Sequence, residues 1–80
     1  MSREMRAFIA LGFNSTHDAL DAEALLGDVG LDVVAIPTPR LIGAGCGIAL
    51  RLDTSDELPA VHYLGLAGIE VAARVTIEDV

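Results

Sequence analysis

The order of its apolar patterns constrains the fold of this chain more than any other feature. Residues 5–12, 31–36, 47–52 and 71–76 have the apolar runs or the alternation typical of strands. Residues 16–29 and a later segment that begins near residue 54 have the apolar spacing of amphipathic helices. The resulting order, β-α-β-β-α-β, predicts an α+β fold, a ferredoxin-like sandwich with a four-stranded antiparallel sheet and two helices on one face.

Polar caps and glycines set the expected limits of the first helix. Ser15 or Thr16 can accept hydrogen bonds from first-turn amides, and Gly30 is a natural C-terminal stop. The apolar stripe of this helix consists of Ala19, Ala22, Leu25, Leu26 and Val29.

The second helix has weaker signals. Thr54 or Ser55 is expected to cap it, and Gly65 and Gly68 weaken and then end it. Its inward-facing residues are expected to be Leu58, Val61, Leu64 and Leu66. Arg51 and Arg74, on the third and fourth strands, are expected to face away from the apolar side, into solvent.

Composition limits the class of protein. Eighty residues with 52% apolar content predict one small domain over residues 1–80. The net charge of −7, without a single lysine, excludes the basic footprint of a nucleic-acid-binding protein. No apolar run approaches the ~20 residues of a membrane span, and the N-terminus lacks signal-peptide features, so a cytoplasmic location is expected.

The connection between the second and third strands, residues 37–46, is unusually long for a hairpin and contains the single cysteine, Cys46. In the usual strand order 4-1-3-2, this loop lies at the same end of the sheet as residues 13–16. The end of the second helix, near Ala67 and Gly68, is expected at that end too. A four-stranded sheet with short edge strands could also form a homodimer.

The glycines in LIGAGCGIAL do not form a nucleotide-binding motif. Gly43 and Gly45 fit the start of a dinucleotide fingerprint, but Ile48 stands at the third position, and a strand follows in place of a helix. A phosphate-binding P-loop requires a lysine, which this chain lacks. The glycines could simply turn the chain, with Cys46 as a small buried residue.

A reactive Cys46 is the alternative. One cysteine cannot form an internal disulfide, and neither histidine lies at ligand spacing to it, so no metal site is expected. Arg40 and the first helix N-terminus could stabilise a thiolate and lower the pKa of Cys46. Gly45 and Gly47 leave room for the active site of a partner to approach the sulfur.

Three segments carry a resemblance to a known family. They are Phe13-x-Ser15-Thr16-x-x-Ala19 with Glu23 and Leu26, then Ile36-Pro37-Thr38-Pro39-Arg40, then Cys46-Gly47-Ile48-Ala49-Leu50. Together they resemble the putative selenium/sulfur carrier protein-like family, from about residue 7 to residue 52. The resemblance departs at Gly43, Ala44 and Gly45, where relatives often have serines, so backbone amides would take the place of those hydroxyls.

The resemblance implies a carrier or accessory protein rather than a stand-alone enzyme. Cys46 would hold sulfur or selenium as a persulfide or perselenide, with no cofactor. Arg40, Gly45, Gly47, Ser15 and Thr16 would surround this cargo. A donor such as a cysteine desulfurase would supply the atom, and a selenium- or sulfur-accepting enzyme would receive it. Two alternatives stay open: an anion- or small-molecule-binding regulatory module, and a single-cysteine redox sensor.

Overall fold

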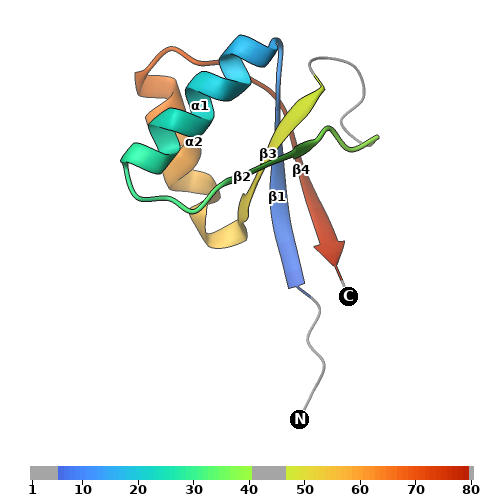
Figure 1. Ribbon diagram of the computed structural model, residues 1–80. Helices are drawn as coiled ribbons and strands as arrows, with labels where there is room; N and C mark the ends of the chain where they lie inside the picture. Colours follow the sequence, from blue (N-terminus) through green and yellow to red (C-terminus); the bar gives the residue numbers. More distant parts are fainter. Residues whose placement is uncertain (1–5, 41–46, 80) are drawn as a thin grey trace.

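The computed structural model describes residues 6–40 and 47–79 of the chain, and its sheet and helices form two layers (Figure 1). The strands are β1 (Arg6–Phe13), β2 (Val34–Pro37), β3 (Ile48–Asp53) and β4 (Val71–Asp79). The helices are α1 (Thr16–Asp28) and α2 (Glu57–Leu66), and a short 3₁₀ turn, η1 (Thr54–Asp56), precedes α2. The sheet order is β2-β3-β1-β4, and every neighbouring pair is antiparallel. The predicted ferredoxin-like architecture is confirmed.

The core lies between one face of the sheet and the two helices. Directly paired residues share a face, so the pairs Ile9–Leu52 and Leu11–Leu50 present four apolar side chains to the helices. These side chains are buried against five residues of the helices: Ala19, Ala22, Leu26, Ala60 and Leu64. Small alanines on both helices allow close approach to the sheet, and the core remains almost wholly aliphatic, with Phe13 its one buried aromatic among the described residues.

Both helices end in the same glycine motif. Gly30 and Gly68 have φ values of +90° and +76°, a region that side chains other than glycine rarely adopt. Beyond α1, the Leu31 amide donates to the Leu26 carbonyl at 2.9 Å, and beyond α2, the Ile69 amide donates to the Leu64 carbonyl at 3.0 Å. These are Schellman closures, and the predicted stops at Gly30 and Gly68 are confirmed.

The start of α2 differs from the prediction. Neither Thr54 nor Ser55 caps this helix; both belong to η1, and no side chain caps α2. Because the helix begins at Glu57, its buried positions are Ala60 and Leu64, four residues apart. Leu58 and Leu66 lie off that stripe and are 77% and 72% exposed, so the expectation that they face inward was wrong.

The limits of β2 also differ from the prediction. The strand begins at Val34 rather than at Leu31, because the Leu31 amide donates its hydrogen bond to the Leu26 carbonyl at the end of α1. It includes Pro37, which pairs with Ile48 on β3. Proline is tolerated at this position because β2 is an edge strand.

A bulge reverses the faces of β4. Between Gly12 and Phe13 the β1–β4 register shifts, so Phe13 pairs with Val71 while Gly12 pairs with Ala73. Val71 therefore packs against the core, whereas the later apolar residues of β4 lie on the face without helices. Arg74 pairs with Leu11 on the helix side, where its guanidinium lies 3.3 Å from the Glu57 carboxylate. Arg74 is exposed, as expected, but it lies on the helix side, so the expectation that it faces away from the apolar side was wrong. Arg51 does lie on the face without helices, over the Phe8 ring.

Candidate functional site

The two segments that flank the candidate loop are held together by backbone pairing. The Thr38 amide donates to the Gly47 carbonyl at 3.1 Å, and the next pair inward is Pro37–Ile48. Cys46 and Gly45 fall within residues 41–46, which lie outside the described residues. The structure therefore defines the base of the loop, and Cys46 is joined covalently to one of its two ends.

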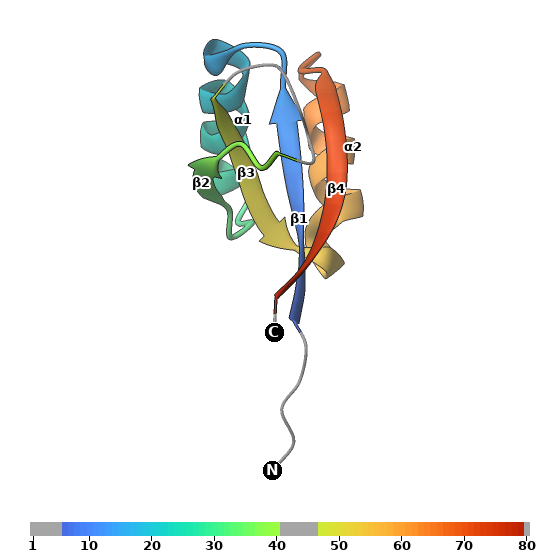
Figure 2. The same ribbon diagram turned by 90° about the vertical axis from the view of Figure 1, so that its right-hand side faces the viewer.

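The register places Gly47 and the start of α1 at one end of the sheet. Gly12 pairs with Ala49, and because β1 and β3 are antiparallel, Asn14 and Gly47 each lie two residues further toward the same end. The pairing of Phe13 with Val71 brings the α2–β4 connection to that end as well. Figure 2 shows the start of α1, the start of β3 and the start of β4 together at the top of the molecule.

Ser15 serves the fold at this end of the sheet. Its side-chain oxygen accepts a hydrogen bond from the Asp18 amide at 3.1 Å, which makes it the N-cap of α1, as predicted. Thr16 is the first helical residue and is exposed. Because Ser15 and Thr16 come directly after the turn that follows β1, their backbone amides lie at the same end of the sheet as Gly47.

Carboxylates surround the first turn of α1. Asp18 lies within this turn, and the His17 imidazole lies 3.2 Å from the Asp21 carboxylate. The Asn14 amide donates to the Glu70 carboxylate at 3.4 Å. This end of the sheet therefore combines the positive end of a helix dipole with several exposed acidic groups.

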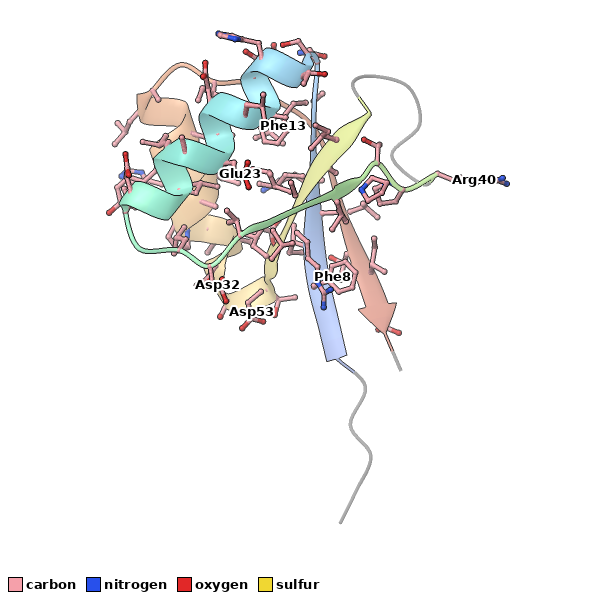
Figure 3. The ribbon with its side chains drawn as sticks, viewed as in Figure 1. Phe8, Phe13, Glu23, Asp32, Arg40 and Asp53 are labelled. Atoms are coloured by element: carbon pink, nitrogen blue, oxygen red, sulfur yellow. The ribbon has the colours of Figure 1, made fainter. Side chains whose placement is uncertain are left out.

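Arg40 is exposed and points away from both layers (Figure 3). In this view Arg40 lies at the right-hand side of the molecule and the start of α1 at its top. Within the described residues no hydrogen bond or ion pair joins Arg40 to Ser15 or Thr16. Within residues 6–40 and 47–79, no carboxylate pairs with Arg40. Its guanidinium is therefore available to an incoming anion or to a partner protein.

A shallow apolar hollow lies beside Gly47. It has a volume of about 240 Å³ and is lined by Ala35, Ile36, Pro37, Gly47 and Ile48. Of these, the sequence singled out only Gly47 as a site residue. Ile36, Pro37, Gly47 and Ile48 belong to the segments that resemble the family. The family motif therefore pointed to these lining residues, whereas the apolar periodicity did not.

Nothing in the described part of the chain requires a glycine at residue 47. Its φ is not positive, and among residues 6–40 and 47–79 a Cβ at this position would meet no atom within 4 Å. The residue that follows Cys46 is thus exposed, without a side chain, and open to approach.

A second hollow lies at the opposite end of the sheet. It measures about 270 Å³, and its lining includes Phe8, Asp32 and Asp53, which Figure 3 shows near the lower end of the sheet. Among the described residues, no group of three or more histidines, cysteines or carboxylates is placed to hold a metal ion. No helix in the described part of the chain is long and apolar enough to cross a membrane.

Comparison with known families gives one match. The model of the family described as "Putative Se/S carrier protein-like" matches residues 9–75, which is most of the chain and includes both flanks of the loop. Neither a curated protein nor a solved structure matches the chain.

Proposed function

Because this chain belongs to the Putative Se/S carrier protein-like family, we propose that it carries sulfur or selenium on Cys46 as a persulfide or perselenide. Residues 1–80 act as one carrier domain. The donor is an enzyme that presents a cysteine persulfide or perselenide, as a cysteine desulfurase does, and the acceptor is a protein that takes up the terminal atom.

The transfer is a balanced exchange. The Cys46 thiolate attacks the terminal sulfur or selenium of the donor, Cys46–S–SH or Cys46–S–SeH forms, and the donor cysteine leaves as its thiolate. A nucleophile of the acceptor then attacks the same terminal atom, and the Cys46 thiolate is released. Each step moves a formally zero-valent chalcogen between nucleophiles, so no external oxidant or reductant is consumed.

The observation that carries the proposal is the open position of Gly47. A transferable atom on Cys46 must meet the sulfur of another protein, and two protein surfaces must therefore approach closely there. Gly47 is exposed, and neither its backbone conformation nor its packing against the described residues needs a glycine, which is what clearance for a partner requires.

The surroundings of Gly47 supply two further contributions. The apolar hollow formed with Ala35, Ile36, Pro37 and Ile48 offers a surface against which a partner can exclude water. The exposed Arg40 can pair with an anionic persulfide or with a carboxylate of the partner. Beyond these two, the first-turn amides of α1, at the same end of the sheet, are a second source of hydrogen bonds to a negative cargo, and Ser15 stabilises that helix end.

Intact-mass measurement tests the proposal directly. The protein is incubated with a cysteine desulfurase and cysteine or selenocysteine, and the mass is read under non-reducing conditions. We expect an added sulfur or selenium on the wild type and none on Cys46→Ser, and we expect the adduct to disappear when an acceptor thiol is added. No adduct with any donor, or an equal adduct on Cys46→Ser, contradicts the proposal.

Two controls separate the proposal from its alternatives. A redox sensor would gain oxygen with peroxide but no transferable chalcogen from the donor. An anion-binding module would be stabilised by sulfate or phosphate to the same extent in the wild type and in Cys46→Ser, without forming any adduct.

A further inference from the structure

The two edges of the sheet are unequally protected. The β2 edge has only four paired residues and ends in Pro37, both of which limit the addition of another strand. The β4 edge has nine residues, VAARVTIED, with no proline and no lysine. Figure 2 shows β4 along the border of the sheet, and its backbone groups that point away from β1 have no strand partner within the described residues.

The side chains of β4 are sorted by face. Pairing with β1 places Arg74 and Thr76 on the helix side, opposite Leu11 and Ile9, and Glu78 follows them on that side. Val75 and Ile77 lie on the face without helices, opposite Ala10 and Phe8. One side of the β4 edge is thus polar and charged, and the other is apolar.

This sequence is complementary to itself in antiparallel register. When Thr76 faces Thr76 of a second copy, Arg74 faces Glu78 twice and Val75 faces Ile77 twice. Each of these pairs lies on one face of the sheet, as cross-strand pairs must, and both opposite charges and apolar pairs stabilise antiparallel strands. A shift by one residue in one direction places Arg74 opposite Ile77 and Val75 opposite Thr76. A shift in the other direction places Val75 opposite Glu78 and Ile77 opposite Thr76. Both shifts put apolar side chains opposite polar ones, so the Thr76-centred register is favoured over them.

We propose that β4 pairs with β4 of a second copy, with Thr76 on the two-fold axis. The dimer then has one continuous sheet across both protomers. The two β2 edges, each with its Gly47 hollow, lie at the far ends of this sheet. Dimerisation therefore leaves both candidate carrier sites open, and it does not depend on the proposed function.

The existing ion pair of Arg74 is compatible with the dimer. Arg74 lies 3.3 Å from Glu57 through one guanidinium nitrogen and is about half exposed. A guanidinium has five N–H donors in a fixed fork, so the same group can reach the partner's Glu78 without leaving Glu57.

Charge variants at the axis test the register. Thr76 is exposed, so Thr76→Lys and Thr76→Glu retain the monomer fold while placing like charges side by side across the axis. We expect each variant alone to dimerise at least about tenfold more weakly than wild type by sedimentation equilibrium, and an equimolar mixture to recover dimers through Lys–Glu pairing. A monomeric wild type at the highest soluble concentration overturns the proposal, as does a mixture no tighter than either variant.

Cross-linking in the Cys46→Ser background gives an independent measurement. Residues directly opposite on antiparallel strands lie within disulfide range, so Thr76→Cys should cross-link to itself under mild oxidation. Ala72→Cys is the matched control, because it is exposed on the same strand but lies beyond reach of its own copy in this register. Equal or faster cross-linking at residue 72 excludes the Thr76-centred register.

Discussion

Gly68 and Gly47 lie in connections at the same end of the sheet, yet the fold requires glycine at only one of them. Gly68 has φ +76°, and its amide and that of Ile69 close the end of α2 by hydrogen bonds of 3.2 and 3.0 Å. Gly47 has no positive φ, and a Cβ there would meet no atom of the described residues within 4 Å. The first glycine is explained by the backbone; for the second, our proposal offers an explanation, which is clearance for a partner that approaches Cys46.

This difference separates two meanings of the same residue type. A glycine that the backbone needs carries information about the fold, and replacing it should change the stability. If the proposed function holds, a glycine that the backbone does not need, beside the only cysteine of the chain, instead carries information about recognition. The predictions that follow measure both quantities, stability and transfer, on matched variants.

The largest change in stability is expected for Gly68→Ala. A side chain in the left-handed region costs about 1–2 kcal/mol, so the free energy of unfolding should fall by that amount. For a domain of this size each kcal/mol corresponds to roughly 4–8 °C in Tm. Urea and thermal unfolding measure both values.

Gly65→Ala is the matched control in the same turn. Gly65 lies within α2, its φ is not positive, and a Cβ there would meet nothing within 4 Å. Alanine favours the helix by about 0.5–1 kcal/mol over glycine, so this variant should be as stable as wild type or more so. If Gly65→Ala destabilises as much as Gly68→Ala, the cost does not come from φ.

The element order and both helix ends were predictable from sequence because they depend on local chemistry. The apolar periods identified every strand and helix, and Gly30 and Gly68 marked the ends of α1 and α2. Ser15 was identified as a cap for the same reason, since its hydroxyl acts only three residues away. Fold class followed, because few topologies accommodate this order.

The errors arose where contacts between distant segments decide the outcome. Leu58 has the spacing of an inward residue relative to Val61, but the helix buries Ala60 and Leu64, and Leu58 lies off that stripe and is exposed. Arg74 alternates with apolar neighbours, but the bulge between Gly12 and Phe13 reverses which face those neighbours occupy. A register shift between two strands leaves no mark in the sequence of either strand alone.

The location of the candidate site in the fold was predictable from the sequence, but the arrangement of its side chains was not. The topology put Gly47 and the start of α1 at one end of the sheet, and the β1–β3 register agrees with this. The hollow of Ala35, Ile36, Pro37 and Ile48 was not foreseen, because it arises from the pairing of β2 with β3. Arg40 shares the loop with Cys46 in sequence, whereas its side chain points outward in the fold.

A smaller change in stability is expected for Ser15→Ala, which tests whether this residue belongs to the fold or to the site. Loss of its 3.1 Å bond to the Asp18 amide should cost about 1 kcal/mol in the free energy of unfolding. Ser55→Ala is the control, since Ser55 is exposed in η1 and caps no helix, and its effect should be close to zero. Sulfur transfer per folded molecule should be unchanged in both variants. A transfer defect in Ser15→Ala alone would instead assign the hydroxyl to the cargo.

The smallest change in stability, and the most informative one, is expected for Gly47→Ala and Gly47→Val. Because a Cβ at residue 47 meets no described atom within 4 Å, the free energy of unfolding of Gly47→Ala should stay within about 0.5 kcal/mol of wild type. The rate of chalcogen transfer from a protein donor should nevertheless fall from glycine to alanine to valine, as the added side chain keeps the two sulfurs apart. Alkylation of Cys46 by a small reagent needs little room, and its rate should hardly change across the series. If the rate of transfer from the donor and the rate of alkylation fall together, the side chain at residue 47 changes the reactivity of the thiol itself. If neither rate falls, Gly47 does not provide clearance for a partner.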